Sequence, residues 1–188
     1  MDKINYLTYI WFTQQWKMEN KILTSGIKII PASTKEHFEE TRRLFKEYYS
    51  LLYSLRDMQL NMDLQSHSSE LADLEHGKYI PPHGLILLST FDDKFTGVVA
   101  VRKMTEDICE MKRLYVRPKY RGSSIGLHLA QLIIQKSREM GYSKMRLDTH
   151  PDMKSAHRLY YALGFYDIPQ YNQNNVPNAL FMELDLKQ

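Results

Sequence analysis

A run of small and basic residues in the middle of the chain has the composition of a phosphate-binding turn. Residues 110–126 read Glu-Met-Lys-Arg-Leu-Tyr-Val-Arg-Pro-Lys-Tyr-Arg-Gly-Ser-Ser-Ile-Gly. An apolar strand here leads into a small-residue loop that feeds the start of a helix. Such a junction presents unpaired backbone N–H groups and the positive end of a helix dipole, and both favour an anion. The run therefore predicts a pyrophosphate site, with Arg117, Lys119 and Arg121 adding positive charge. A plain connection between strand and helix is the alternative.

Two familiar phosphate motifs do not fit this turn, and the histidines do not suggest a metal. A Walker loop requires Gly-Lys followed by Ser or Thr, whereas Leu127 and His128 follow Gly126. A dinucleotide-binding Gly-x-Gly-x-x-Gly run is also missing from the sequence. The 7 histidines are scattered without helical pairing or a cysteine partner, so no metal site is expected.

The apolar periodicity places these residues in an ordered series of elements. Strand patterns cover residues 27–30, 85–91, 95–102, 108–116, 144–147, 165–168 and 180–186. Helical patterns begin at a capping box over residues 33–36, surround Leu71 and Leu74, run from Ile125 to Met140 before Gly141, and run from a capping Asp152 to Leu163 before Gly164. Short connections in the first half imply an antiparallel meander. The order predicts an α/β domain with a mixed central sheet, a meander followed by parallel strand–helix units, flanked by helices.

Composition limits the classes of protein that this chain can be. Its 188 residues suit one domain, and 43% apolar with 25% charged residues is typical of globular proteins. A net charge of +3 suits an anionic ligand but is too weak for wrapping nucleic acid. No apolar run reaches the ~20 residues that span a bilayer, so no membrane contact is expected. The single cysteine, Cys109, favours a core position and a reducing, cytoplasmic setting. Residues 1–25 are interpreted as an N-terminal extension, and residues 26–188 as the folded domain.

Two segments resemble one family. Residues 121–126, Arg-Gly-Ser-Ser-Ile-Gly, resemble the Arg/Gln-x-x-Gly-x-Gly/Ala signature of the GNAT N-acetyltransferase superfamily. Residues 156–165 are similar to its closing Ala-x-x-Leu-Tyr-x-x-x-Gly-Phe pattern. The resemblance covers roughly residues 27–186. It implies the single-domain GNAT fold and transfer of acetyl from acetyl-CoA to a primary amine of a small molecule, by direct attack in a ternary complex. A homodimer is expected only because the family often forms one.

The resemblance also implies roles for individual residues. The pyrophosphate of acetyl-CoA would be held by Arg121, Gly122, Ser123, Ser124, Ile125 and Gly126. Leu114, Tyr115 and Val116 would pair with the pantetheine arm. The N–H of Leu114 or Val116 would polarise the thioester carbonyl. Tyr160 would protonate the leaving thiolate, with a core tyrosine as the alternative.

Glu110 is the first candidate for the general base, because it lies four residues before Leu114 as in family members with a carboxylate base. Partial burial would raise its pKa toward working pH. An ion pair with Lys112 or Arg102 is the alternative for this carboxylate, and a water chain is the alternative for the base.

Strand alternation predicts that Lys112 and Arg113 point to opposite faces. An inward Arg113 or Arg102 could bind an acceptor carboxylate, and a solvated strand face is the alternative. By resemblance, Tyr48, Tyr79 and Tyr171 lie in segments that line the acceptor cleft.

Two departures from the family pattern leave other functions open. Ser124 stands where glycine or alanine is usual, and a left-handed backbone there would cost ~1–2 kcal/mol. Met153 stands where the family often has asparagine. A non-catalytic acyl-CoA-binding regulatory module is therefore the main alternative to an enzyme. Nucleic-acid binding through the basic residues of the 112–121 segment is a third hypothesis, which predicts a steep loss of affinity with salt.

Overall fold

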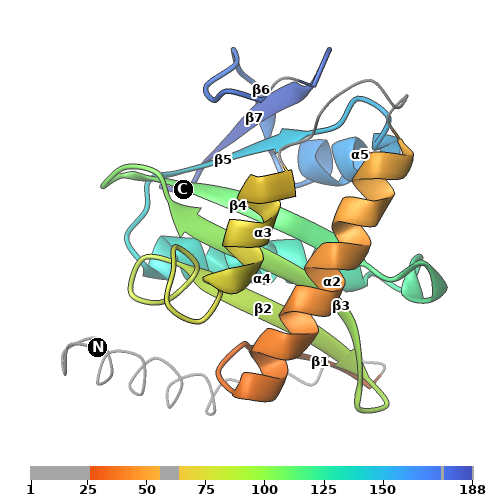
Figure 1. The fold of residues 1–188 in the computed structure, drawn as a ribbon. Helices are drawn as coiled ribbons and strands as arrows, with labels where there is room; N and C mark the ends of the chain where they lie inside the picture. The colour runs from red at the N-terminus through yellow and green to blue at the C-terminus, as the bar shows by residue number, and fades with distance from the viewer. Residues whose placement is uncertain (1–25, 56–63, 175, 188) are drawn as a thin grey trace.

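The computed structural model describes residues 26–55, 64–174 and 176–187, which form one sheet flanked by helices (Figure 1). The strands are β1 (Ile27–Pro31), β2 (Leu85–Phe91), β3 (Lys94–Lys103), β4 (Ile108–Val116), β5 (Lys144–Thr149), β6 (Tyr166–Asp167) and β7 (Leu180–Asp185). The helices are α2 (Lys35–Ser54), α3 (Leu64–Ala72), α4 (Ile125–Glu139) and α5 (Lys154–Ala162), with a short 3-10 turn η1 (Pro118–Tyr120). The expected N-terminal extension, residues 1–25, lies outside the described residues.

The sheet is mixed, as predicted. Its strand order is β1-β2-β3-β4-β5-β7-β6. Strands β1 to β4 pair antiparallel in sequence order, which confirms the meander. Strand β4 then pairs parallel with β5, while β7 pairs antiparallel with both β5 and β6. Among the described strands, the β4–β5 pair is thus the one parallel contact, at the point where α4 connects two neighbouring strands.

Both faces of the sheet are buried, because each is covered by helices. Along β2, Leu85 and Leu87 pack into the cluster that includes α4, while Ile86 and Leu88 pack into the cluster that includes α2. This alternation is the period-two pattern of a strand with two buried faces. Figure 1 shows α2 and α3 in front of the sheet and α4 behind it. The predicted core role of Cys109 is confirmed, since its side chain is fully buried in the α4-side cluster.

Two helix starts differ from the prediction by one residue. The N-cap of α2 is Thr34, whose Oγ1 accepts a hydrogen bond from the His37 N–H, and not Ser33. The N-cap of α5 is Met153, and not Asp152. In both places neighbouring residues can cap, and sequence spacing does not choose between them. Helix α4 ends before Gly141, whose φ of 90° is left-handed as predicted.

Within the described segments, no helix is long and apolar enough to cross a membrane. The same segments contain no group of three or more His, Cys, Asp or Glu side chains that could hold a metal ion.

Candidate active site

An irregularity in β4 shapes the site. Val98 and Ala100 of β3 lie opposite Tyr115 and Lys112 of β4, so two steps along β3 match three along β4. The extra residue is a β-bulge, and Arg113 within it has a left-handed φ of 59°. The bulge turns Lys112 and Arg113 to the same face of the sheet, the one covered by α2 and α3. The prediction that they point to opposite faces is therefore wrong, because it assumed an unbroken strand.

Strands β4 and β5 separate on the C-terminal side of their pairing. Their parallel register joins Ile108 to Lys144 and continues only as far as Glu110 and Arg146. Beyond this point β4 continues to Val116 and β5 to Thr149, with no register pair between them in the described structure. The main chain of residues 114–116 therefore faces β5 without a paired strand, and a strand edge of this kind offers hydrogen bonds to a ligand.

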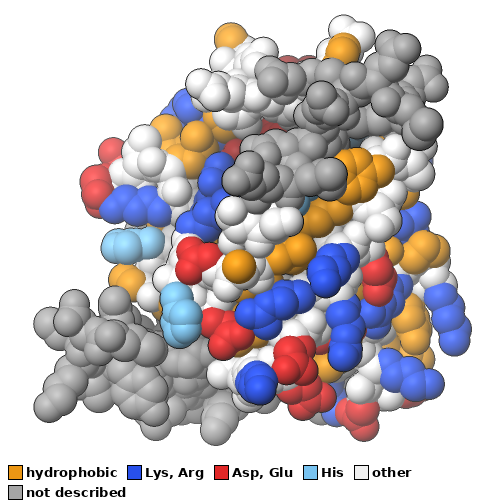
Figure 2. All heavy atoms as spheres, in the orientation of Figure 1, with side chains coloured by type: hydrophobic (Ala, Val, Ile, Leu, Met, Phe, Trp, Pro, Cys, Tyr) orange, Lys and Arg blue, Asp and Glu red, His pale blue; other side chains and the backbone are white. Residues whose placement is uncertain are grey.

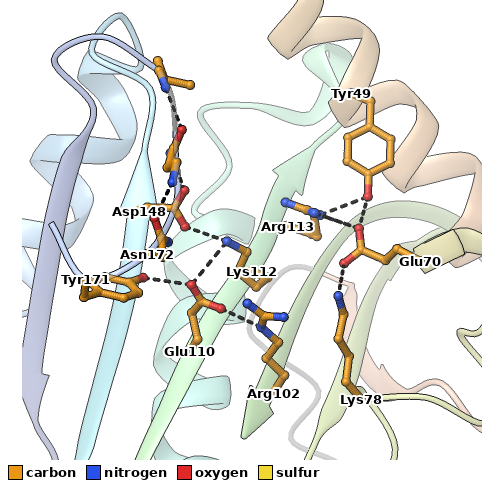
Figure 3. A network of polar contacts seen from close by, with 12 residues as sticks. Tyr49, Glu70, Lys78, Arg102, Glu110, Lys112, Arg113, Asp148, Tyr171 and Asn172 are labelled. Carbon is orange, nitrogen blue, oxygen red and sulfur yellow. Dashed lines mark hydrogen bonds and ion pairs between the residues drawn. The ribbon is translucent and has the colours of Figure 1, made fainter. Parts of the chain in front are cut away.

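A polar cluster surrounds Glu110 beside this opening (Figure 3). The Glu110 side chain is 0% exposed. It accepts hydrogen bonds from Arg102 Nε at 2.6 Å, Tyr171 Oη at 2.9 Å and Lys112 Nζ at 3.4 Å. Lys112 Nζ also reaches Asp148 Oδ1 at 2.6 Å, and Asn174 Nδ2 donates to the other Asp148 oxygen at 2.7 Å. The segment that holds Tyr171 and Asn174 is thereby tied to β4 and β5.

The environment of Glu110 contradicts the expected rise in its pKa. Burial alone would raise the pKa of Glu110, but Lys112 and Arg102 outweigh burial and leave the pKa below its ordinary value. The alternative, an ion pair with Arg102 and Lys112, is confirmed. Asp148 behaves in the same way, because Lys112 and the Asn174 amide lower its pKa against the effect of burial. Both groups are therefore carboxylates at neutral pH and are weak bases.

A second cluster surrounds Glu70 of α3. Arg113 Nη2 donates to Glu70 Oε2 at 2.7 Å, and Tyr49 and Tyr79 both donate their hydroxyls to the same carboxylate. Burial would raise the pKa of Glu70, but Arg113 and the two tyrosine hydrogen bonds hold it at about 2. The guanidinium of Arg113 also lies 5.0 Å from the centre of the Tyr49 ring. This cluster fixes the bulge, because it holds the side chain of Arg113, whose backbone within the bulge is left-handed.

Two residues that the sequence predicted at the acceptor site are largely buried. Tyr79 is buried, and its hydroxyl is occupied by Glu70. Arg113 is largely buried, and Glu70 neutralises its charge. Of the two arginines predicted to bind a carboxylate, Arg102 is the more exposed.

The small-residue turn has the expected backbone. Gly122 has a φ of 83° and Ser124 a φ of 61°, so the backbone of both residues is left-handed. Residues 121–124 are exposed, whereas the side chain of Ile125 is buried in the core. The first main-chain hydrogen bond within α4 runs from the His128 N–H to the Ser124 carbonyl. The N–H groups of residues 125–127 precede it and have no acceptor within the helix. The buried Nδ1 of His128 lacks a hydrogen-bond partner among the described residues, so this turn has unused hydrogen-bonding capacity.

The positive charge expected around this turn is smaller than the sequence suggests. Arg117 Nη2 forms ion pairs with Glu40 and Glu47 of α2, each at 2.7 Å, and Nη1 donates to the Phe95 carbonyl. The positive charge of Arg117 is therefore neutralised by carboxylates of α2, and these ion pairs join α2 to the end of β4. Arg121 Nε donates to the Val116 carbonyl at 3.0 Å, and its side chain is otherwise exposed.

Tyr160 of α5 is buried against Phe165, with ring centres 5.7 Å apart. Burial raises the pKa of Tyr160 above its ordinary value, and the nearby Tyr48 and Asp148 add to the rise. Tyr48 belongs to α2 on the opposite face of the sheet. Tyr160 itself packs into the core cluster on the α4 side of the sheet.

Charges on the face covered by α2 and α3 are mixed. Figure 2 shows Lys and Arg side chains interspersed with Asp and Glu over the described part of this face. Nucleic-acid binding requires a basic stripe, so this face gives that hypothesis no support.

Sequence reasoning missed Glu70, Asp148 and Asn174 as members of the site. Asp148 and Glu70 are ordinary acidic residues in a strand and a helix, and no local motif distinguishes them. Strands β3 and β4 carry several cations, and a buried cation needs a partner of opposite charge. This count is the only signal in the sequence that could have indicated carboxylates from elsewhere near β3 and β4.

Comparisons with known proteins agree with this geometry. Residues 38–165 match the Acetyltransferase (GNAT) family. An uncharacterized N-acetyltransferase of Schizosaccharomyces pombe is 36% identical over 167 residues, which are 87% of this chain and 98% of that protein. N-acetylaspartate synthetase of Mus musculus is 32% identical over 98 residues, 52% of this chain but only 33% of that protein.

Solved structures show the same fold. A GNAT-family acetyltransferase of Staphylococcus aureus Mu50 has a TM-score of 0.71 at 22% identity, covering 86% of this chain and 99% of that one. An acetyltransferase of Salmonella typhimurium, solved with acetyl-CoA, has a TM-score of 0.62 at 18% identity, covering 87% of this chain and 96% of that one. The family match and the S. pombe relative show that this chain belongs to the GNAT family of acetyltransferases.

Proposed function

We propose that the protein transfers the acetyl group of acetyl-CoA to the primary amine of a small-molecule acceptor, by direct attack in a ternary complex. The observation that carries this proposal is the separation of β4 from β5 after Glu110 and Arg146. It exposes a strand edge that leads to the proposed anion-binding turn at the start of α4. Family membership supports acetyl-CoA as the acetyl donor.

The residues present suit this co-substrate. The exposed turn at residues 121–124 and the first N–H groups of α4 would hold its pyrophosphate, with the Arg121 guanidinium alongside. Leu114, Tyr115 and Val116 would pair with the pantetheine arm through the unpaired edge of β4. An N–H from Leu114 or Val116 would stabilise the negative charge that develops on the thioester oxygen. Ser124 adopts the required left-handed backbone, so its departure from the family pattern does not count against binding.

Tyr160 would supply the proton for the departing thiolate. When the amine nitrogen forms its bond to the acetyl carbon, the carbon–sulfur bond breaks and the sulfur takes a proton from the Tyr160 hydroxyl. A raised tyrosine pKa makes a weaker acid, but burial also makes a thiolate more basic. Burial raises the pKa of the Cys109 thiol in this chain to about 12. Burial thus acts in the same direction on a tyrosine hydroxyl and on a thiol.

The proton of the acceptor ammonium would leave through water. This is the alternative that the sequence left open, and the low pKa of Glu110 favours it, since a weak base does not deprotonate an amine efficiently. In this proposal Glu110 holds Arg102 and Lys112 in place at the acceptor side.

Calorimetric titration of acetyl-CoA tests the location of the co-substrate. Wild-type protein should bind it with micromolar affinity, and the double variant Arg121→Ala, Gly126→Pro should lose binding. Lys28→Ala on β1, whose side chain pairs only with Asp93 in the described structure, is the control and should bind like wild type. Wild-type protein that binds no acetyl-CoA would overturn the proposal.

Turnover separates an enzyme from a regulatory module. Release of free thiol from acetyl-CoA should be stimulated by members of a panel of primary amines. The panel includes amines that carry carboxylates, because the name of the mouse relative describes an N-acetylated amino acid. Binding without stimulation by any amine would instead support the non-catalytic acyl-CoA-binding module.

A further inference from the structure

The acceptor side of the site has more positive than negative charge. Four cations and three carboxylates meet in the Glu110 and Glu70 clusters. Lys112 and Arg113 are each 14% exposed and bonded within the clusters. The other two cations, Lys78 at 43% and Arg102 at 31%, are the exposed ones. The surplus positive charge therefore reaches solvent at Lys78 and Arg102.

Arg102 has unused donors. It binds Glu110 through Nε alone, and neither Nη atom has a hydrogen-bond partner among the described residues. The Arg102 side chain is partly exposed, and neither Nη is among the buried atoms without a partner in the described part of the chain. A guanidinium fork with its two Nη groups free matches the two oxygens of a carboxylate.

Lys78 lies next to this fork and is held there by the protein. Its Nζ is 3.3 Å from Glu70 Oε1. Burial lowers the pKa of Lys78, Glu70 raises it, and the positive charges of Arg102 and Arg113 lower it further. Figure 3 draws the Arg102 guanidinium between Glu110 and the Lys78 amine. Two exposed cations held near each other repel, and a bound anion would relieve that repulsion.

We propose that Lys78 and the Nη groups of Arg102 bind a carboxylate of the acceptor, an inference that rests on the proposed acetyl transfer. Arg102 supplies the bidentate contact and Lys78 the second charge. Lys78 is thus a specificity-determining residue contributed by the segment between α3 and β2.

The position of this carboxylate site sets the length of the acceptor. Arg102 lies opposite Glu110 in the β3–β4 register. Glu110 precedes Leu114 by four residues, which at the rise of a strand is on the order of 10 Å along β4. An α-amino acid, whose amine and carboxylate share one carbon, does not bridge this distance. The acceptor is therefore a primary amine at the far end of an aliphatic chain from its carboxylate, as in ε-aminocaproate or the side chain of lysine.

Steady-state kinetics on a matched series tests this inference. Glycine, aspartate, γ-aminobutyrate, ε-aminocaproate and hexylamine are compared as acceptors with saturating acetyl-CoA. Wild-type enzyme should have its highest kcat/KM with ε-aminocaproate, about tenfold above hexylamine, which lacks the carboxylate. Lys78→Met should raise the KM for ε-aminocaproate about tenfold with little change in kcat, and should leave hexylamine unaffected. Lys78→Arg should restore the low KM.

The controls separate a binding role from a structural one. Lys103→Met removes the same charge one residue from Arg102, at a lysine that pairs with Glu106, and should leave both substrates unaffected. If Lys78→Met impairs hexylamine and ε-aminocaproate equally, or if aspartate or glycine is the best acceptor, the inference is overturned while acetyl transfer stands. If no amine is acetylated although acetyl-CoA binds, the proposed function fails and the inference fails with it.

Discussion

Tyr160 is the side chain on which the proposed chemistry depends most directly. Its ring is buried against Phe165, and its hydroxyl is the only part that a phenylalanine would lack. We expect Tyr160→Phe to lower kcat roughly 100-fold, because the leaving thiolate loses its proton donor. The affinity for acetyl-CoA should stay within about twofold, since the apolar contacts remain. Initial rates of thiol release measure kcat, and calorimetry measures the affinity for acetyl-CoA.

The neighbouring tyrosine provides a matched control. Tyr161 is 48% exposed, and its hydroxyl donates to Asp167 on the surface. Tyr161→Phe should leave kcat unchanged. A Tyr160→Phe enzyme with wild-type kcat would show that the thiolate takes its proton from solvent, and Tyr160 would then be a core residue only.

Glu110 makes a different prediction, because it acts through its neighbours. Its folded-state pKa lies below the ordinary 4.5, so the carboxylate stabilises the fold at pH values above 4.5 and loses this contribution as the pH falls through the folded pKa. We expect Glu110→Gln to lower the free energy of unfolding by about 3–5 kcal/mol at pH 7, because Arg102 and Lys112 lose their buried partner. The difference from wild type should shrink as the pH falls below 4.5. Urea unfolding at several pH values measures it.

The pH profile of turnover separates this anchoring role from general-base catalysis. If water accepts the amine proton, the acidic limb of kcat/KM should persist in Glu110→Gln at the pH where wild type shows it. Loss of that limb in the variant would restore Glu110 as the general base.

The start of α4 has an unusual N-cap. Ser124 is its N-cap, but the side chain forms no capping hydrogen bond and the backbone is left-handed. We expect Ser124→Gly to raise the stability by ~0.5–1 kcal/mol, because relief of the ~1–2 kcal/mol strain exceeds the added entropy of the unfolded chain. This corresponds to a rise in Tm of about 1–4 °C for a domain of this size. Thermal unfolding followed by circular dichroism measures the shift.

Ser123 is the control for this substitution. Its Oγ donates to the Tyr120 carbonyl at 2.5 Å, so Ser123→Gly removes a bond that holds the turn and should lower the Tm. Equal effects of the two substitutions would contradict the strain argument at Ser124.

The sequence predicted most of the elements because their signals are local. Strands β2 and β4 begin and end where the apolar runs of residues 85–91 and 108–116 do, and α4 begins at Ile125 as expected. The bulge at Arg113 could not be predicted in this way. An arginine gives no propensity for a left-handed backbone, and its conformation is held by Glu70, Tyr49 and the β3 register, which come from distant parts of the chain.

The proposed cofactor turn and the proposed acceptor side differ in the same respect. Arg121 to Gly126 form one continuous segment, so their spacing is readable. The carboxylates Glu70 and Asp148 reach the site from α3 and β5, and only the folded sheet brings them to Arg113 and Lys112. The predicted pKa shift at Glu110 had the wrong sign because Lys112 and Arg102 were not weighed against desolvation.

For the whole molecule, the buried carboxylates predict how it responds to acid. The pKa values of Glu70 and Glu183 are held at about 2, by Arg113 and two tyrosines in one case and by Lys144, Arg146 and Tyr166 in the other, against burial in both. The pKa values of Glu110 and Asp148 are lowered as well. In the unfolded chain these groups titrate near 4.5 for Glu and 3.8 for Asp. At pH values below these pKa values, the unfolded chain binds protons that the folded chain does not bind.

The free energy of unfolding should therefore be level from pH 7 to about 5 and fall steeply between about pH 4.5 and 2, by ~1.4 kcal/mol per pH unit for each such carboxylate. Urea unfolding followed by circular dichroism gives the slope. Glu183 pairs with Arg146 of β5 and Tyr166 of β6, so Glu183→Gln should reduce the slope by about one proton. A slope of zero across this range would show that the four carboxylates take up protons without unfolding, which their buried ion pairs do not permit.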